Sequence, residues 1–413
     1  MIEIEEIEAA YVCIREVVNQ TPLMKDELLS EKYSANIYLK REDLQVVRSY
    51  KIRGAYNKIA SLSGEDRQRG IVCASAGNHA QGVAFACLKL NILGRIFMPA
   101  TTPKQKIKQV RMFGRDNVEI ILTGDTYDQA YEAAKIDCAA NKSVFIHPFD
   151  DLLVAAGQGT VGIEIMEQAD FPIDYAIVPI GGGGLISGLG SWLRVKSPAT
   201  RIIGVEPAGA AAMKESLDQG QRVVLERFEK FVDGAAVSMV GELNFEIARE
   251  VIDGMILVPE GKVCTTILQL YNEEAIVVEP AGALSIAALD LMADKIKGKN
   301  VVCIVSGGNN DITRTEEIKE RSLLYEGLKH YLIIRFPQRS GALREFVNEV
   351  LGPDDDITHF EYTKKNSRDS GPALVGIETR SMADYQAMLQ RLEDKHINYK
   401  SVNDSPDLFH LLI

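Results

Sequence analysis

Short apolar runs alternate with helical stretches over much of this 413-residue chain. The runs between residues 70 and 150 predict strands at 71–74, 95–98, 118–122 and 144–146, with helices at 80–89, at 103–113 and from 127 onward. A second set of strands is expected at 175–179, 201–205 and 301–305. Such alternation is typical of right-handed βαβ units around parallel sheets. The pattern therefore predicts an α/β fold of two lobes with a cleft between them.

The two ends of the chain have patterns of their own. Near the start, apolar residues recur at helical spacing and predict an amphipathic helix over Ile4, Ile7, Tyr11, Ile14 and Val18. Beyond the charged stretch 316–321, which is expected to be a solvated helix and linker, the predicted elements are a strand at 331–336, a helix at 342–351, strands at 357–362 and 373–379, a second helix and a strand at 399–402. This order is that of a small α+β domain of ferredoxin-like type.

The second helix of that small domain opens with the capping box Ser381-x-x-Asp384. One of its faces is apolar and is expected to be buried, with the residues Met382, Tyr385, Leu389 and Leu392. The pattern as a whole predicts a first domain at 1–322, in which a small lobe of about 43–150 is inserted in a large lobe. A linker at 323–328 would connect it to a second domain at 329–404.

Composition and charge exclude several classes of protein. A net charge of −12 argues against nucleic-acid binding, which requires basic surfaces. The six cysteines are scattered without a Cys-x-x-Cys pair, and the histidines lack metal-ligand spacing, so neither disulfides nor a metal site is expected. The acidic start resembles no export signal, and Pro179 with four glycines interrupts the uncharged stretch 175–193, so no membrane span is expected. A cytoplasmic location fits these features.

Two loops that follow predicted strands are rich in residues that bind anions. Ser75-Ala76-Gly77-Asn78-His79 could form a carboxylate cradle from backbone N–H groups, a hydroxyl and an amide, although such a turn can also simply cap a helix. Gly181-Gly182-Gly183-Gly184 precedes a helix that is expected to start at Leu185, and its N–H groups could approach phosphate oxygens. A dinucleotide site is the alternative, with Glu206 as the ribose ligand, but the spacing Gly-x-Gly-x-x-Gly is absent.

A lysine and a serine complete the candidate chemistry. Lys51 lies in the run Ser49-Tyr50-Lys51-Ile52-Arg53-Gly54-Ala55, and Ser306 opens the turn Ser306-Gly307-Gly308-Asn309 after a strand. An amine that can form a Schiff base and a loop that can hold a phosphate are the two features that pyridoxal phosphate (PLP) requires. The serine could face a pyridine nitrogen. Taken singly, a surface lysine and a plain turn are the simpler interpretations.

Together these motifs resemble fold type II PLP enzymes, the tryptophan synthase β-like group, and most closely the threonine dehydratases. The resemblance also covers 40–43, 279–283 and 323–327, and so nearly the whole chain. It implies that Lys51 carries PLP as a Schiff base, that Asn78 bonds the ring oxygen and that Ser306 faces the pyridine nitrogen. The phosphate would lie on Gly181, Gly182, Gly183, Gly184 and Leu185, and the substrate carboxylate on Ser75, Ala76, Gly77, Asn78 and His79.

The implied reaction is the dehydration and deamination of L-threonine, or L-serine, to a 2-oxo acid and ammonia. The freed Lys51 amine would remove the α-proton, and the bound phosphate would protonate the departing hydroxyl. Because Ser306 cannot form an ion pair with the pyridine, prompt elimination is favoured. Related racemases carry the sequence Ser-Ser-Gly-Asn-His in the carboxylate loop, and their second serine acts as an acid. This chain resembles them except at that serine, where it has Ala76, which cannot donate a proton. Metal-dependent relatives carry an acidic residue where this chain has Ala212, so no such metal requirement is expected.

The last domain resembles a single ACT-like regulatory module, with the turn 337–343 and Phe360-Glu361-Tyr362 as its signature. The resemblance implies isoleucine as an allosteric effector, a place at the first step of isoleucine biosynthesis, and a homo-oligomer, a tetramer in the family. Three alternatives stay open at this point. The enzyme could be a catabolic serine/threonine deaminase, the chain could be an amino-acid sensor with an enzyme-like body, or the last domain could serve only dimerisation.

Overall fold

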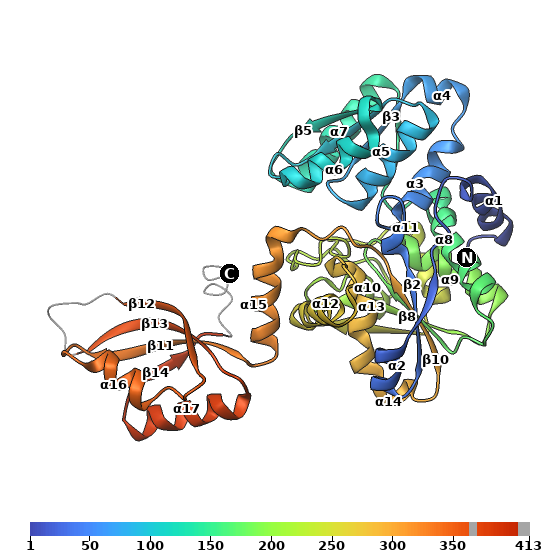
Figure 1. The fold of residues 1–413 in the computed structure, drawn as a ribbon. Helices are drawn as coiled ribbons and strands as arrows, with labels where there is room; N and C mark the ends of the chain where they lie inside the picture. The colour runs from blue at the N-terminus through green and yellow to red at the C-terminus, as the bar shows by residue number, and fades with distance from the viewer. Residues whose placement is uncertain (363–369, 404–413) are drawn as a thin grey trace. The chain divides into compact units, whose positions relative to one another are not determined.

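The chain forms two compact units in a computed structural model that describes residues 1–362 and 370–403. The first unit comprises Met1–Asp311 and the second Ile312–Ile413 (Figure 1). The units divide before helix α15 (Thr315–Tyr325), whereas the sequence pattern predicts the division after it. The predicted linker 323–328 begins within that helix, and residue 404, the predicted end of the last domain, lies outside the described residues.

A six-stranded sheet forms the large lobe of the first unit, in the order β1-β2-β10-β7-β8-β9. All neighbours are parallel except β1 and β2, which pair antiparallel. The strands are β1 (Leu23–Asp26), β2 (Asn36–Arg41), β7 (Tyr175–Pro179), β8 (Arg201–Pro207), β9 (Gly254–Val258) and β10 (Asn300–Val305). Strands β7, β8 and β10 are mostly buried along their lengths, as expected for a parallel sheet that is covered on both faces.

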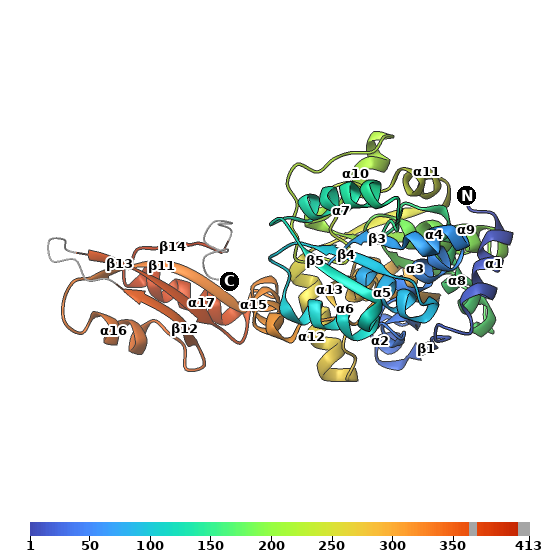
Figure 2. The same ribbon diagram turned by 90° about the horizontal axis from the view of Figure 1, so that it is seen from above.

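A separate four-stranded parallel sheet forms the small lobe, in the order β5-β4-β3-β6. Its strands are β3 (Ile71–Ala74), β4 (Gly94–Met98), β5 (Val118–Leu122) and β6 (Val144–Phe145). Figure 2 shows α7 on one face of this sheet and α5 with α6 on the other. All four strands lie between β2 and β7 in the chain, so the small lobe is an insertion in the large one.

Helices cover both sheets of the first unit. They are α1 (Ile4–Ile14), α2 (Glu27–Tyr33), α3 (Lys51–Ala60), α4 (Gly64–Arg69), α5 (Asn78–Leu90), α6 (Lys104–Gly114), α7 (Tyr127–Asn141), α8 (Leu152–Gln168), α9 (Gly184–Lys196), α10 (Ala212–Gln219), α11 (Glu242–Val251), α12 (Glu260–Glu274), α13 (Pro280–Ala287) and α14 (Ala293–Ile296). Residues of α1, α8, α9 and α11 share one apolar core with the large sheet. Residues of α3, α5 and α6 share another with the small sheet.

The second unit is a four-stranded antiparallel sheet with helices packed on it, in the order β12-β13-β11-β14. Its elements after α15 are β11 (Lys329–Pro337), α16 (Ala342–Glu349), β12 (Asp356–Tyr362), β13 (Ser370–Glu378), α17 (Met382–Asp394) and β14 (Tyr399–Ser401). The predicted ferredoxin-like order of strands and helices is confirmed. So is the helix cap, since the Ser381 hydroxyl accepts the N–H of Asp384 at 3.2 Å.

The structure corrects several local predictions. Met382 is 48% exposed, because it is the first residue of α17, and Met388 is buried beside Tyr385 and Leu392 instead. Pro103 caps α6 from outside the helix, and the opening helix ends at Ile14 without reaching Val18. Strands β1, β2 and β9 were not predicted. Helix α5 begins at Asn78, two residues before its predicted start, and this difference affects the site described below.

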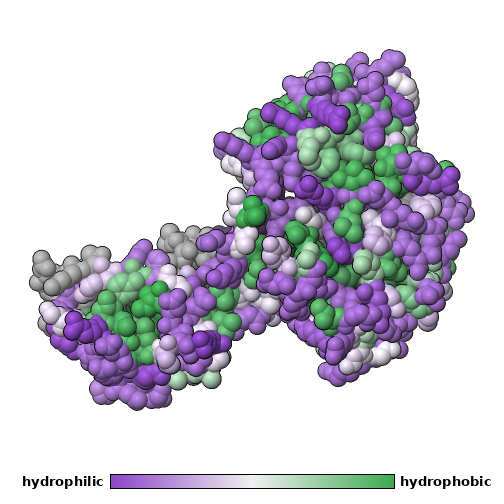
Figure 3. Space-filling view, viewed as in Figure 1, coloured by the Kyte–Doolittle hydropathy of each residue, from purple (hydrophilic) through white to green (hydrophobic). Residues whose placement is uncertain are grey.

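No helix in the described part of the chain is both long and apolar enough to cross a membrane. The surface seen in Figure 3 is mainly hydrophilic. All six cysteines are free, and four of them, Cys73, Cys87, Cys264 and Cys303, are buried.

Candidate active site

Lys51 is the first residue of α3, so its side chain leaves the helix at the end that faces a cavity. The cavity is lined by Tyr50, Lys51, Asn78, Pro179, Ile180, Gly181, Gly234, Ala235, Glu279, Ala281 and Ser306. Four sequence-predicted residues from four distant segments therefore meet here, namely Lys51, Asn78, Gly181 and Ser306. The other predicted residues, at 75–77, 79 and 182–185, belong to the same loops but do not line the cavity.

The surroundings of the Lys51 amine hold it in place and lower its pKa. Its Nζ donates a hydrogen bond to the Pro148 carbonyl oxygen at 2.9 Å. Burial lowers the pKa of Lys51 to about 8, although the negative charge of Glu279 acts in the opposite direction. A sizeable fraction of the amine is therefore neutral near pH 8, and only a neutral amine can act as a nucleophile or as a base.

The glycine loop connects β7 to α9 and is the candidate cradle for an anion. Its shape needs glycine, because Gly183 has φ +94° and a Cβ on Gly182 would lie 2.3 Å from the Phe149 ring. The Gly182 carbonyl oxygen accepts a hydrogen bond from Asn244 Nδ2 at 3.0 Å, which fixes the orientation of this peptide group. The first intrahelical bond of α9 runs from the Ser187 N–H to the Gly183 carbonyl. Of the predicted phosphate ligands, the N–H groups at 184 and 185 precede that bond, so they have no partner within the helix and could contact a phosphate.

The loop 75–79 connects β3 to α5, with Gly77 as the N-cap and Asn78 in the first turn. The Ser75 hydroxyl accepts the Gly77 N–H at 3.2 Å, which tightens the turn. The His79 ring is buried and lies 3.0 Å from the Ile146 carbonyl oxygen. Burial, helped by Lys51, lowers the pKa of His79 to about 3, so the ring is neutral. Because the His79 ring contacts Ile146, the groups of this loop that could contact an anion are its backbone N–H groups and the Ser75 hydroxyl.

Ser306 follows β10 and is brought next to the lysine segment by the backbone. The Tyr50 N–H donates to the Ser306 carbonyl at 3.2 Å, and an isolated bridge pairs Ser49 with Gly307. Ser306 is buried, so its hydroxyl is shielded from bulk solvent. An amine, an anion cradle, an amide and a hydroxyl thus surround one cavity. This set of donors, and the glycine cradle in particular, fits pyridoxal phosphate.

Sequence reasoning missed the side-chain role of Glu279. This residue precedes α13, is buried, and accepts a hydrogen bond from Asn78 Nδ2 at 2.6 Å. Its motif, 279–283, was noted in the sequence, but nothing local indicates that the carboxylate reaches a residue 201 positions away. Because glutamate is usually exposed, its residue type predicts a surface position for Glu279 and not a place in a cavity.

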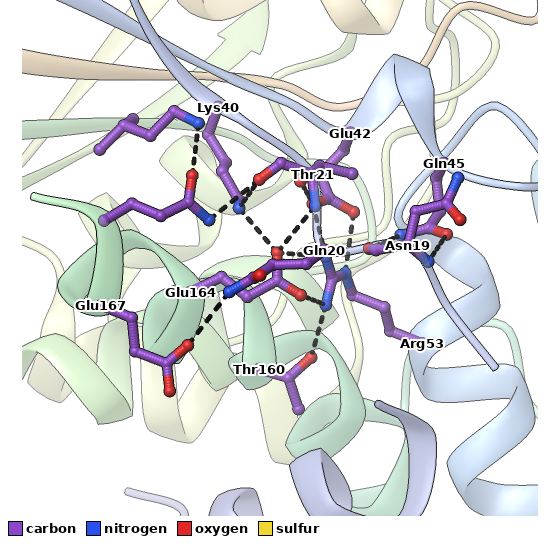
Figure 4. Close-up of polar contacts among 12 residues, drawn as sticks. Asn19, Gln20, Thr21, Lys40, Glu42, Gln45, Arg53, Thr160, Glu164 and Glu167 are labelled. Atoms are coloured by element: carbon purple, nitrogen blue, oxygen red, sulfur yellow. Dashed lines mark hydrogen bonds and ion pairs between the residues drawn. The ribbon is translucent and has the colours of Figure 1, made fainter. Parts of the chain in front are cut away.

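A buried ion cluster connects α3 to neighbouring elements, and Figure 4 shows its contacts. The fully buried Arg53 guanidinium bonds both carboxylate oxygens of Glu42, each at 2.8 Å, and both oxygens of Glu164, at 2.6 and 2.9 Å. Lys40 Nζ reaches Glu164 at 2.7 Å. Two cations therefore balance two anions, and they tie α3 to α8 and to the end of β2. Since α3 begins at Lys51, the cluster also fixes the start of the helix that carries the amine.

The dinucleotide alternative does not fit the geometry. Glu206, the candidate ribose ligand, is fully buried, and its two oxygens accept the N–H groups of Met213 at 2.7 Å and Lys214 at 2.9 Å. Both oxygens therefore cap α10, which leaves the carboxylate to serve the fold. Among the described residues, no group of three or more potential His, Cys, Asp or Glu ligands lies together. The expectation that no divalent metal is required stays a prediction.

Comparison with known proteins agrees with this picture. A family described as "Pyridoxal-phosphate dependent enzyme" matches residues 14–307, and one described as "C-terminal regulatory domain of Threonine dehydratase" matches residues 320–412. The chain is 58% identical to the biosynthetic L-threonine dehydratase IlvA of Halalkalibacterium halodurans over 412 residues, which is 100% of this chain and 99% of that protein. It is also 58% identical to IlvA of Bacillus subtilis over 413 residues, which is 100% of this chain and 98% of that protein.

Among solved structures, the chain is similar to the processed form of threonine deaminase isoform 2 from Solanum lycopersicum. The TM-score is 0.73 at 42% identity, with 78% of this chain and 94% of that chain covered. The predicted fold class, a two-lobed fold type II PLP enzyme followed by a small regulatory domain, is confirmed by these similarities.

Proposed function

This chain belongs to the biosynthetic threonine dehydratase family of PLP-dependent enzymes, and we propose that it converts L-threonine to 2-oxobutanoate and ammonia. The substrate first loses one water molecule, and hydrolysis of the dehydrated product then takes up one water molecule and releases ammonia. The net reaction is therefore L-threonine to 2-oxobutanoate and ammonia. This is the first committed step toward isoleucine. The observation that carries the proposal is the single cavity in which the Lys51 amine meets Asn78, Gly181 and Ser306.

The binding roles of the residues follow from the donors that each presents. Lys51 would link PLP covalently, Ser306 would face its pyridine nitrogen, and Asn78 would bond its ring oxygen. The phosphate would lie on the N–H groups at 181–185, where the dipole of α9 favours a dianion. The substrate carboxylate would lie on the loop 75–79, including Ser75, Ala76, Gly77 and the His79 backbone. When bound, PLP supplies the electron sink for the pair left at the α-carbon.

The protein's own groups perform the proton transfers and control the outcome. The neutral Lys51 amine accepts the α-proton, which its pKa of about 8 allows at moderately alkaline pH. The Ser306 hydroxyl is a neutral hydrogen-bond partner that cannot form an ion pair, which favours rapid loss of the β-hydroxyl. Ala76 cannot donate a proton, so return of a proton to the opposite face of the substrate, as racemisation requires, has no donor at this position.

L-Serine carries the same β-hydroxyl and should be a second substrate. A comparison of kcat/KM for L-threonine and L-serine tests this assignment. A preference for threonine, together with inhibition by isoleucine, supports a biosynthetic enzyme. A preference for serine without any response to isoleucine would favour the catabolic deaminase instead. Absence of both turnover and a visible PLP absorption band would favour the amino-acid sensor.

We also propose that isoleucine binds the second unit and inhibits the enzyme. The support is the match of residues 320–412 to a regulatory domain and the position of the reaction at the head of a pathway that ends in isoleucine. Figure 3 shows apolar residues gathered over the sheet of this unit, and on its edge strand Phe360 and Tyr362 are about one-third exposed. Coupling of about 1–3 kcal/mol would make the inhibition partial to strong at moderate isoleucine.

The test uses the full chain beside a chain that ends at Asp311, where the first compact unit ends. Isoleucine should inhibit the full chain, and the shortened chain should retain threonine dehydration and lose the response. Equal inhibition of both chains, or no inhibition of the full chain, would show that the second unit does not bind the effector. By family resemblance we propose a homotetramer, measured by sedimentation with and without isoleucine, and a cytoplasmic location that suits six free cysteines.

A further inference from the structure

Glu279 lies in the coenzyme cavity yet has no part in the roles assigned above. Its carboxyl group is buried, and its Oε1 would clash at 2.3 Å with a Cβ on Gly307, so it lies directly against the Ser306 turn. Burial, together with the nearby Asp233, raises the pKa of Glu279 to about 7, while Asn78, Lys106 and the Asn309 N–H act against this. The cavity therefore contains an acid whose charge changes in the physiological range.

The hydrogen bonds of the Asn78 side chain fix the orientation of its amide group. Asn78 Oδ1 accepts from Asn309 Nδ2 at 2.7 Å, and that same Nδ2 also donates to the Val47 carbonyl at 2.9 Å. Asn78 Nδ2 donates to Glu279 Oε1 at 2.6 Å. An amide nitrogen carries two hydrogens, so one remains for a ligand in the cavity. An ionised carboxylate only accepts, and it therefore turns the NH2 group, and not the oxygen, toward itself and the cavity.

We propose that Glu279 is a positioning residue that holds the Asn78 amide toward the coenzyme and places a carboxylate in the cavity that also contains the Lys51 nitrogen. The inference rests on the proposed function, in which Asn78 bonds the ring oxygen of PLP. The charged and titratable groups that face Glu279 are Lys51 and Tyr50 from the α3 segment, Asp233 from the large lobe and Lys106 from α6. Asp233 and Lys106 are paired with each other, which reduces their separate influence.

The sign of the charge effect follows from the contacts. The negative charge of Glu279 favours a protonated nitrogen at Lys51, against the effect of burial. Glu279→Gln keeps an oxygen that can accept from Asn78 and removes the charge. The nitrogen that links Lys51 to bound PLP should therefore lose its proton at lower pH. We expect the midpoint of the pH titration of the visible PLP absorption to fall by on the order of one pH unit.

A second variant separates charge from orientation. Glu279→Asp keeps the charge but shortens the side chain, so the contact with Asn78 should be lost. We expect the absorption midpoint to stay near the wild-type value and the Kd for PLP, measured by adding PLP to the apoenzyme, to rise by roughly tenfold, the equivalent of one hydrogen bond. Glu206→Gln is the matched control, since Glu206 is also buried with a pKa raised by burial to about 8, but its oxygens cap α10.

Full-chain holoenzymes are compared, with circular dichroism and melting temperature as checks of folding. A lowered midpoint in Glu279→Gln and weaker PLP binding in Glu279→Asp, with Glu206→Gln unchanged in both, support the role. If wild type binds PLP and dehydrates threonine but Glu279→Gln has the wild-type midpoint, the role is wrong and the proposed function stands. If wild type shows no PLP absorption band, the proposed function fails and this role fails with it.

Discussion

Arg53→Met should strongly destabilise the protein, because Arg53 neutralises two buried carboxylates. Its guanidinium is inaccessible to solvent and makes two bonds to Glu42 and two to Glu164. Burial alone raises the pKa of Glu42, but Arg53, together with Lys40 and Thr21, outweighs that effect and holds the pKa below its ordinary value. Methionine fills part of the arginine volume without a charge. Lys40 would then remain as the partner of two buried anions in the cluster.

The expected loss is about 3–5 kcal/mol, which is typical when one partner of a buried ion pair is removed and the other charge stays buried. For a unit that spans Met1–Asp311 the melting temperature should fall by roughly 5–8 °C. Arg249→Met is the matched control, because Arg249 pairs with Glu246 on the exposed surface of α11, with side-chain exposures of 48% and 63%. An exposed pair of this kind contributes about 0–1 kcal/mol.

Thermal and urea unfolding, followed by far-UV circular dichroism with PLP in excess, measure the loss. The double variant Arg53→Met/Glu42→Gln removes one cation and one anion together, so it should be more stable than Arg53→Met alone. If the double variant regains stability, the loss in Arg53→Met is due to an unpaired buried charge. If it does not, the loss is due to packing. If Arg53→Met is no less stable than the Arg249→Met control, or if the two changes simply add, the cluster does not act as a balanced set of charges.

Three further predictions concern the cavity and the glycine loop next to it. Lys51→Ala should abolish the visible PLP absorption and nearly all turnover, since it removes both the covalent link and the base; threonine dehydration at a near wild-type rate would contradict the assignment. Gly182→Ala should weaken PLP binding at least tenfold, because its Cβ would lie 2.3 Å from the Phe149 ring, and unchanged affinity in a PLP titration would refute the cradle. Ser306→Asp should leave PLP bound but slow elimination and increase side products, and an unchanged rate and product ratio would show that Ser306 does not face the pyridine nitrogen.

The part of the site that could be predicted from the sequence consists of loops. Glycine, serine and asparagine directly after buried strands indicate anion binding, because the carboxyl ends of parallel strands meet at one edge of a sheet. The loops at 75–79, 181–184 and 306–309 follow β3, β7 and β10 as expected. Strand β1, in contrast, could not be predicted from the sequence pattern. Its four residues, Leu23-Met24-Lys25-Asp26, show no clear alternation, since β1 is a short edge strand of the sheet.

The buried charges could not be predicted in the same way. Lys40, Glu42, Arg53 and Glu164 are residue types that normally lie on the surface, and no local pattern shows that they are buried. Their burial depends on contacts between segments as far as 124 residues apart in the chain. Glu279 presents the same difficulty, since its partner Asn78 lies in the other lobe. A charged residue can be buried only where the fold also places its charged or hydrogen-bonding partners. The position of those partners depends on the whole fold and not on the local sequence.

The two buried charge systems act on Lys51 in different ways. Arg53 is two residues from Lys51, but its charge is balanced by Glu42 and Glu164, and the shifted pKa of Lys51 reflects only burial and Glu279. The ion cluster therefore controls where the amine is, through the start of α3, and Glu279 controls how readily it is protonated. Loss of Arg53 should lower stability and PLP content together, whereas loss of the Glu279 charge should shift a titration in a protein that remains folded. Because the two variants differ in what they change, comparing them separates the placement of the Lys51 amine from the electrostatic control of its protonation.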